Sequence, residues 1–342
     1  MLTVVTTSPR VAPGLLSRAA WRALETAGSV LASADHAQLP ALDEAGIRVA
    51  DPGQGAELIR SLASAAELGE SVVWLPDPGI DVEGLLGSVG ELGSLGSVGE
   101  GRTRVVVGSA DLPGARLLDL VATMDRLRVD CPWDARQTHE SLAPHLLEEP
   151  YEALDALESG DQEAFREELG DVLLQVVFHA RVASERDDGT GYTVDDVADG
   201  IVAKLKRRHP HVFGDVTVSG ADEVKVNWDA IKREEKRARA ERDGQDGPDP
   251  SALDGVPFGQ PALALAAQLQ RRAARAGVPD ELARLDGDAG PLDPAGDGPG
   301  AEIGRELFRL VVAARAADRD PEFELRAVAR RYRDLVRAWE SQ

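Results

Sequence analysis

A pair of acidic, amphipathic helical patterns between residues 146 and 175 constrains the fold of this chain more than any other feature. Only a short turn at residues 159–161 separates the two patterns, so they predict two helices packed as antiparallel neighbours. Acids three or four positions apart share one helix face. The acids in this arrangement are Glu148, Glu149 and Glu152 on the first helix and Glu168 and Asp171 on the second.

The apolar residues of the two patterns predict where the helices meet. They are Leu146, Leu147, Leu154 and Leu157 on the first helix and Leu169, Val172, Leu173, Val176 and Val177 on the second. Because the acids flank these residues, some carboxylates are expected beside the helix–helix seam. Converging carboxylates repel one another and lose hydration, and a hard divalent cation, first of all Mg²⁺, relieves that cost. On spacing alone, a solvated acidic face is an equally good interpretation in a chain this rich in acids.

The charge of the chain limits its partners. It has 60 acids against 38 lysines and arginines in 342 residues, a net charge of −22. That balance disfavours nucleic acid and an anionic membrane surface as partners, but it leaves room for a small basic phosphate site. Cys131 is the only cysteine, so a reduced, cytoplasmic protein is expected. The sequence shows neither a signal-peptide pattern nor an apolar run of the roughly 20 residues that span a bilayer.

The chain changes character several times, which predicts a multidomain protein. Residues 1–111 alternate strand-like and helical patterns, as in a small parallel α/β domain. Residues 112–240 are helical throughout, residues 241–260 form a polar Pro/Gly linker, and residues 261–342 are helical again. A repeated G-S-V-G-E within residues 84–101 predicts a flexible loop, and with it a shrunken, inactive α/β unit.

The first acidic helix contains two prolines whose positions matter. Ser141 is the expected N-cap of this helix, which places Pro144 in the first turn. Pro150 then lies inside the helix, between Glu149 and Glu152. A proline in a helix interior costs about 3 kcal/mol and removes a backbone hydrogen bond. The acids are still expected to form a site, and a kink at Pro150 would weaken or shift its metal geometry.

An ordered set of motifs in the central block resembles the MazG family of nucleoside triphosphate pyrophosphohydrolases. The motifs are C-P-W-D-x-x-Q-T-H from Cys131 to His139, E-E-x-x-E from Glu148 to Glu152, E-x-x-D from Glu168 to Asp171, R-R-H-P-H-V-F from Arg207 to Phe213, and Asn227-Trp228 with Lys232. A lone E-E-x-x-E would be weak evidence, whereas the full set in this order is specific.

The resemblance implies an all-α bundle, usually dimeric, that hydrolyses nucleoside triphosphates to nucleoside monophosphate and pyrophosphate in nucleotide-pool housekeeping. It implies Mg²⁺ as cofactor, with Mn²⁺ as a substitute. The implied roles are metal binding by Glu149, Glu152, Glu168 and Asp171, orientation of the site or a water by Glu148, phosphate binding by Lys204, Arg208 and Lys232, and nucleotide contact by Trp133 and Trp228. The metal would neutralise charge developing on the phosphates, and the cations would supply the rest of the compensation.

The two flanks resemble related domains in weaker form. Residues 1–111 look like a degenerate tetrapyrrole-methylase-type domain without the glycine pattern for the methyl donor, so no methyl transfer is expected. Residues 251–342 resemble a remnant of a second MazG unit. There, Arg305 stands at the position of the metal-binding aspartate, and no E-E-x-x-E helix precedes it. This remnant is expected to be catalytically inactive and to serve dimer packing.

Several alternatives remain open at this point. A di-iron carboxylate bundle needs Glu-x-x-His on two helices, a pattern that this sequence lacks. His209 and His211 flank a proline and are expected to belong to a loop rather than to a metal site. Either tryptophan is as well explained by a place in the core. The alternative function is a non-catalytic nucleotide sensor, suggested by the two degenerate flanks and by Pro150.

Overall fold

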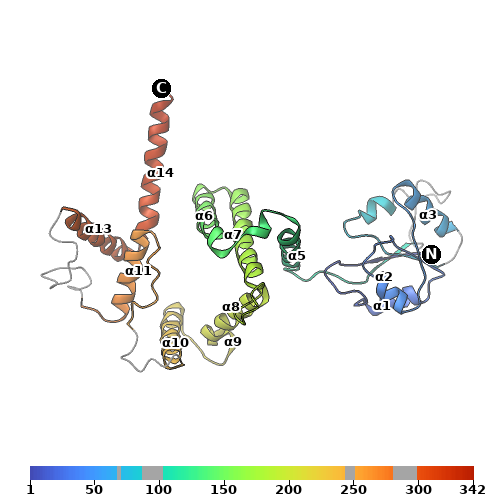
Figure 1. Ribbon diagram of the computed structural model, residues 1–342, viewed down its shortest axis with the longest axis horizontal. Helices are drawn as coiled ribbons and strands as arrows, with labels where there is room; N and C mark the ends of the chain where they lie inside the picture. The colour runs from blue at the N-terminus through green and yellow to red at the C-terminus, as the bar shows by residue number, and fades with distance from the viewer. Residues whose placement is uncertain (68–70, 87–102, 243–250, 280–298) are drawn as a thin grey trace. The chain divides into compact units, whose positions relative to one another are not determined.

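The computed structural model describes residues 1–67, 71–86, 103–242, 251–279 and 299–342 (Figure 1). The chain divides into two compact units, Met1–Ile201 and Val202–Gln342, and each is described by itself below. The described residues are mostly helical, with one small sheet near the N-terminus, as the sequence predicts. Among them, no helix has both the length and the apolar composition that crossing a bilayer requires.

The N-terminal region is a parallel, five-stranded sheet with the strand order β3-β2-β4-β1-β5. Its elements are β1 (Leu2–Thr6), α1 (Arg18–Glu25), β2 (Ser29–Leu31), α2 (Leu39–Glu44), β3 (Val49–Ala50), α3 (Ala56–Glu67), β4 (Val72–Trp74) and β5 (Thr103–Val107). The predicted small parallel α/β region is therefore confirmed, whereas its predicted boundary as a separate domain at residue 111 stays a prediction. Most of the loop predicted at residues 84–101 lies outside the described residues.

The central strands of this sheet are buried on both faces, which explains their continuous apolar runs. Successive side chains of a strand point to opposite faces. Val4 of β1 accordingly belongs to a cluster with Leu62 of α3, and Val5 belongs to a second cluster with Leu24 of α1. The sheet thus has a hydrophobic layer on each side.

The helical part of the first unit is built around one antiparallel hairpin. Its elements are α5 (Arg116–Asp130), the 3₁₀ turn η1 (Asp134–Arg136), α6 (His139–Ser159), α7 (Gln162–Ala183) and the first part of α8 (Val194–Arg208). Gly160 ends α6 in the left-handed conformation, with φ 80°. Asp161 caps α7, and its carboxylate accepts hydrogen bonds from the backbone N–H groups of Glu163 and Ala164, both at 3.1 Å. The predicted turn is confirmed.

The start of α6 differs from the prediction. Thr138, not Ser141, is the N-cap: the backbone N–H of Ser141 donates to Thr138 Oγ1 at 3.2 Å, and the backbone N–H of Thr138 donates to Ser141 Oγ at 2.9 Å. Such a reciprocal capping box satisfies two donors at once, so the helix begins before Ser141. Pro144 is therefore beyond the first turn. Both Pro144 and Pro150 lie inside α6, which continues unbroken through them.

The predicted seam between α6 and α7 is only partly right. Val177 is buried as expected, but six of the predicted seam residues are between 37% and 59% exposed: Leu146, Leu147, Leu157, Leu169, Leu173 and Val176. The buried residues of the two helices are Leu142, Ala153, Ala156, Gln175, Val177, Phe178, Ala180 and Ala183. Half of these residues are alanines. The larger side chains are left as an apolar surface on the hairpin.

The second unit is entirely helical in its described part. Its elements are the end of α8, α9 (Pro210–Phe213), α10 (Ala221–Arg242), α11 (Ala262–Arg275), α13 (Pro299–Ala316) and α14 (Pro321–Glu340). The buried side-chain amide of Gln270 on α11 donates to the backbone carbonyl of Phe308 on α13 at 2.9 Å, and Ala267 and Val311 are buried in the same two helices. The predicted C-terminal helical remnant is thus confirmed as helical.

Candidate active site

Three carboxylates meet on the α6–α7 hairpin. Glu149 and Glu152 lie one turn apart on α6, and Glu168 lies on the antiparallel α7. One oxygen atom of each carboxylate is within 4.8 Å of an oxygen of the other two. Glu149 and Glu168 are half-buried, whereas Glu152 is exposed. This convergence follows from helical spacing on α6 and from the close approach of the two helices.

The other two predicted acids, Asp171 and Glu148, lie outside this group of three carboxylates. Asp171 is exposed and lies outside the three-carboxylate group, but its charge raises the pKa of Glu149 and of Glu168. Glu148 faces another partner, because its carboxylate is 3.5 Å from Nδ1 of His145, one turn earlier on α6. The hairpin therefore joins three of the predicted acids directly and a fourth through its charge.

Burial and mutual repulsion perturb the acids of this group. The pKa of Glu149 is raised by burial first, and then by the negative charges of Asp171, Glu152 and Glu168. The pKa of Glu168 is also raised by burial first, and then by the negative charges of Glu152, Asp171 and Glu167. A divalent cation compensates for both the lost hydration and the repulsion, because an opposite charge nearby favours the ionised form. The donor set, carboxylate oxygens only, is the one that Mg²⁺ and Mn²⁺ prefer.

Trp133 lies beside the hairpin with one side of its ring supported. Its ring centroid is 6.3 Å from that of His145 on α6 and 6.4 Å from that of Phe178 on α7, both in edge-on orientation. The residue is 54% exposed, so the described part of the chain does not enclose it as core. An aromatic face held in this way is available to a flat ligand such as a nucleobase.

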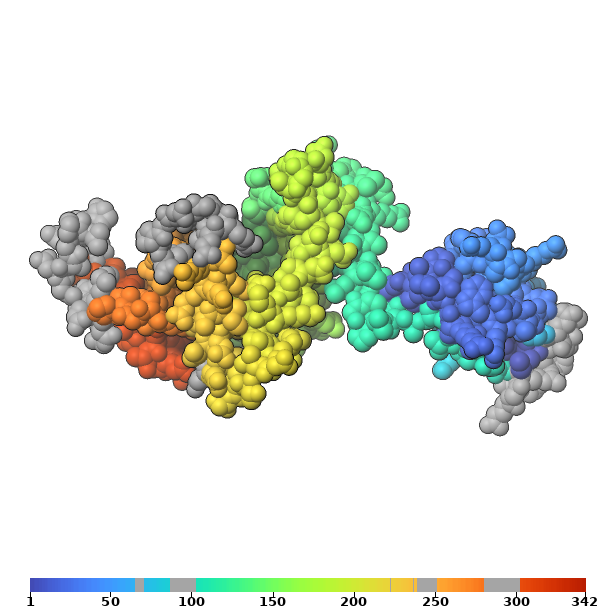
Figure 2. Space-filling view, turned by 90° about the horizontal axis from the view of Figure 1, so that it is seen from below, coloured from blue at the N-terminus to red at the C-terminus, as the bar shows by residue number. Residues whose placement is uncertain are grey.

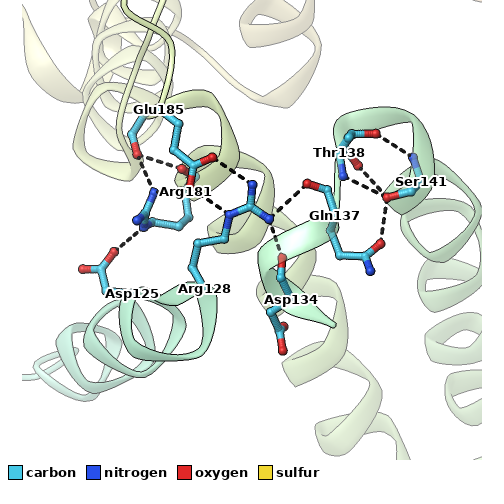
Figure 3. A network of polar contacts seen from close by, with 9 residues as sticks. Asp125, Arg128, Asp134, Gln137, Thr138, Ser141, Arg181 and Glu185 are labelled. Carbon is cyan, nitrogen blue, oxygen red and sulfur yellow. Dashed lines mark hydrogen bonds and ion pairs between the residues drawn. The ribbon is translucent and has the colours of Figure 1, made fainter. Parts of the chain in front are cut away.

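An arginine that the sequence analysis did not single out holds the segment that carries Trp133 (Figure 3). Arg128 of α5 donates through Nη1 to the backbone carbonyl of Asp134 and, at 3.0 Å, to that of Gln137. Its Nε and Nη2 atoms form a two-pronged ion pair with Glu185, both at 2.8 Å. The side chain of Arg128 is only 9% exposed.

The same network continues into the first turn of α6. The side-chain amide of Gln137 donates to the backbone carbonyl of Trp133 at 2.9 Å and accepts a hydrogen bond from Ser141 Oγ at 2.7 Å. Arg181 of α7 reinforces the other end, with contacts of 2.9 Å to Glu185 and 2.8 Å to Asp125. The spacing of Arg128 and Glu185 in the sequence carries no sign of this pairing, since each residue resembles a solvated charge near a helix end.

The predicted phosphate-binding residues belong to the second unit. Arg208, at the end of α8, pairs with Glu235 at 2.6 Å, and its guanidinium carbon is 5.9 Å from the ring centroid of Trp228. His209 packs edge-on against the same tryptophan, with 5.0 Å between ring centroids. Trp228 and Lys232 are one turn apart on α10. Arg208, Trp228 and Lys232 thus form one group, in which burial and the charges of Arg272 and Arg208 lower the pKa of Lys232.

Lys204, His209 and His211 lie on or next to the end of α8. Lys204 is exposed on α8, one turn before Arg208. Nδ1 of His209, protonated, donates a hydrogen bond to the backbone carbonyl of Leu205 at 2.7 Å, and the ring centroids of His209 and His211 are 5.6 Å apart. In the described residues, neither histidine belongs to a group of potential metal ligands.

Comparison with known proteins identifies a family and several relatives. The MazG nucleotide pyrophosphohydrolase domain matches residues 137–213, which contain all five predicted acids. An uncharacterised 26.1 kDa protein of Streptomyces cacaoi is 48% identical over 236 residues, or 68% of this chain and 86% of that protein. A nucleoside triphosphate pyrophosphohydrolase of Mycolicibacterium smegmatis is 40% identical over 238 residues, or 70% of this chain and 63% of the relative.

A third relative combines high coverage with the family name. The nucleoside triphosphate pyrophosphohydrolase/pyrophosphatase MazG of Thermotoga maritima is 37% identical over 229 residues, which cover 63% of this chain and 81% of that protein. Since this identity extends over most of the relative's length, the resemblance inferred from the motifs is confirmed. The chain belongs to the MazG family of nucleotide pyrophosphohydrolases.

Proposed function

We propose that this protein hydrolyses nucleoside triphosphates between the α and β phosphates, releasing nucleoside monophosphate and pyrophosphate in an Mg²⁺-dependent reaction. The observation that carries the proposal is the convergence of Glu149, Glu152 and Glu168 within the segment that matches the family. The names of the relatives from Mycolicibacterium smegmatis and Thermotoga maritima support the same activity.

The acidic residues have the composition that such a metal site needs. Glu149, Glu152 and Glu168 would hold Mg²⁺, with Asp171 as a fourth ligand, and Mn²⁺ would substitute because it also prefers oxygen donors. When bound, the ion supplies charge neutralisation on the substrate phosphates and a lowered pKa for a bound water. Glu148 lies outside the three-carboxylate group, next to His145. The family resemblance implies that Glu148 would orient the site or the attacking water.

The remaining residues would bind and place the substrate. Lys204, Arg208 and Lys232 would hold the phosphates, because cations compensate the charge that the metal leaves unneutralised. Glu235 keeps the Arg208 guanidinium in place beside Trp228. Trp133 and Trp228 would contact the base and sugar. No nucleophilic side chain is required, because water attacks directly.

We place this activity in a homodimer that serves nucleotide-pool housekeeping in the cytoplasm. The apolar surface left on the α6–α7 hairpin supports the dimer, because soluble monomers rarely leave such a patch uncovered. The net charge of −22 is consistent with a small-molecule substrate rather than nucleic acid.

The decisive experiment follows the products of the full chain. Purified protein is incubated with each of the common NTPs and dNTPs, and with oxidised and deaminated NTPs, in MgCl₂ or in EDTA. Equal amounts of nucleoside monophosphate and pyrophosphate are expected with Mg²⁺, and neither with EDTA. Release of nucleoside diphosphate and phosphate would contradict cleavage at the α–β bond. Binding of NTP without any product would instead identify a nucleotide sensor.

A further inference from the structure

A cluster of cations lies in the second unit where α10 meets α11, whose gold and orange surfaces adjoin in Figure 2. Nη1 of Arg275 on α11 is 3.1 Å from Oδ1 of Asp229 on α10. Lys232 follows Asp229 by three positions and shares its helix face. Burial lowers the pKa of Lys232 most, and the charges of Arg272, Arg208 and Arg275 lower it further, while the charge of Asp229 raises it. Lys232 therefore lies close enough to three arginines to be repelled by them.

Carboxylates balance this cluster only in part. Arg208 pairs with Glu235 and Arg275 with Asp229. Arg272 instead donates from Nη1 to two backbone carbonyls at 2.9 and 3.4 Å. In the part of the chain that the structure describes, no carboxylate lies within ion-pair distance of Arg272 or of Lys232.

The excess of positive charge extends to α13. Arg315 donates from Nη1 to the side-chain oxygen of Gln270 at 3.4 Å, and burial and the charges of Arg271 and Arg275 lower its pKa. Cations gather here although the chain as a whole carries a net charge of −22. Positive side chains that lie close together and are not all paired with the protein's own carboxylates favour the binding of a multiply charged anion.

We propose that Arg272 and Arg275 of α11 bind the outer phosphates of the nucleoside triphosphate, together with Arg208 and Lys232. The C-terminal remnant then contributes directly to substrate binding, although it lacks the acids for catalysis. This inference rests on the proposed function. The planar fork of an arginine suits a phosphate group, since two N–H donors reach two oxygens at once.

Two observations favour the substrate's phosphates over a separate anion site. The α11 arginines are continuous with Lys232, a residue of the family's downstream motif. Trp228, one turn before Lys232 on the same helix, contacts Arg208. An aromatic ring and a row of cations on neighbouring turns match the two ends of a nucleotide, its base and its phosphate chain.

The test compares three single variants of the full chain: Arg272→Gln, Arg275→Gln and, as matched control, Arg333→Gln. Arg333 belongs to the same unit and forms an ion pair with Asp334 on α14. Its replacement by Gln removes one positive charge, as the two α11 substitutions do. Affinity for inorganic tripolyphosphate is measured by calorimetry in EDTA, and KM and kcat for ATP are measured with Mg²⁺. Circular dichroism confirms that each variant is folded.

The α11 variants are expected to weaken tripolyphosphate binding about tenfold each and to raise KM by a similar factor, because each loses a charge-assisted hydrogen bond. Their kcat should stay within about threefold of wild type. The control should match wild type throughout. Arg272→Lys, which keeps the charge without the fork, should recover part of the affinity.

Three results would overturn the inference: wild type that does not bind tripolyphosphate, α11 variants with unchanged affinity and KM, or lost tripolyphosphate binding with an unchanged KM. The last result would assign the cluster to an anion other than the substrate. Failure of the proposed function would look different, since wild type would then release no pyrophosphate from any NTP. In that event, the affinity of each variant for a non-hydrolysable ATP analogue is measured instead of KM, and this affinity still tests the roles of Arg272 and Arg275.

Discussion

Glu149 on α6 lowers the stability of the protein without a cation but is well placed to bind one. Its pKa is raised by burial and by three neighbouring acids, which means that the protein without a cation is less stable with this group ionised. The same placement puts its oxygen within reach of two further carboxylates. The side chain is therefore costly in the empty protein and useful only when a cation is bound. Such residues are typical of binding sites rather than of stable surfaces.

Replacing Glu149 by Gln should separate these two effects. The substitution keeps the shape of the side chain and removes its charge, so we expect the melting temperature in EDTA to rise by about 1–3 °C. Pyrophosphate release should fall by about 100-fold or more, because a metal ligand is lost. Added Mg²⁺ should stabilise wild type more than the variant in thermal melts.

Glu163→Gln provides the control. Glu163 is an exposed acid in the first turn of α7, and within the described residues its ion pair is with Arg166 of the same helix, at 3.6 Å. It should leave both turnover and the Mg²⁺ effect unchanged. If Glu149→Gln and Asp171→Asn both retained full turnover, the assignment of the acidic group as the catalytic centre would be wrong.

At the scale of elements, Arg128 shows how one buried side chain can organise a segment. It connects α5, the turn η1 and the end of α7 through two backbone carbonyls and Glu185. The ion pair with Arg128 lowers the pKa of Glu185. Because that pKa is depressed in the folded state, the pair stabilises the protein fully above the ordinary value of 4.5. The stabilisation is lost as the pH falls through the lowered pKa.

Arg128→Met should destabilise the first unit by about 2–3 kcal/mol, because two carbonyls and a carboxylate lose their charged donor. The difference in melting temperature from wild type should stay constant from pH 8 to about 5 and narrow below pH 4.5. KM for NTP should rise, since the segment holding Trp133 is released. Arg126→Met, at an 85% exposed arginine of the same helix, should change none of these quantities. A pH-independent difference would contradict the role of the Glu185 pair.

The prolines of α6 pose a question about the same hairpin. The helix continues through Pro150 although the proline cannot donate a backbone hydrogen bond. Pro150→Ala should therefore raise the free energy of unfolding by about 1–3 kcal/mol, measured as a higher urea midpoint with an unchanged slope. Mg²⁺ affinity and turnover should stay within about twofold, because the carboxylates already converge. Pro144→Ala is the matched control, with a similar gain further from the acids.

A tenfold loss of Mg²⁺ affinity in Pro150→Ala alone would contradict this expectation. It would mean that the proline itself shapes the metal site. Pro150 is one of the reasons for the alternative that the protein is a non-catalytic nucleotide sensor, so the turnover of Pro150→Ala also tests that alternative.

The elements also show how far the sequence could predict the structure. The hairpin and its acids were predictable because helical spacing and the turn at Gly160 act locally. The sequence does not distinguish Thr138 from Ser141 as the N-cap, because either hydroxyl can cap a helix; the reciprocal hydrogen bonds of the structure identify Thr138. The sequence predicts more buried residues between α6 and α7 than the structure shows, because periodicity identifies an apolar face but does not show what covers it. Arg128 and Glu185 could not be paired, because packing of α5 on α7 brings them together.

At the scale of the whole molecule, the exposed apolar surface of the hairpin supports the predicted homodimer. Leu173→Glu places a charge on that surface, where Leu173 is 37% exposed. If two copies meet there, the variant should sediment as a monomer while wild type is a dimer, with the dissociation constant raised about 100-fold or more. Arg166→Glu adds an acid on an exposed position of the same helix and should remain dimeric. A monomeric wild type at micromolar concentration would contradict the prediction.

The brief connection between α6 and α7 also affects when the site can form during synthesis. Only Gly160 and Asp161 separate the two helices, so their contacts join residues close in the sequence, and such contacts form fastest. Translation at about 5–20 residues per second then completes Lys232 on the order of several seconds after the hairpin. The acidic hairpin of the nascent chain is therefore expected to be synthesised before Lys232, one of the residues proposed to hold the phosphates, and Mg²⁺, if it binds there as proposed, would stabilise the hairpin while the rest of the protein is still being made.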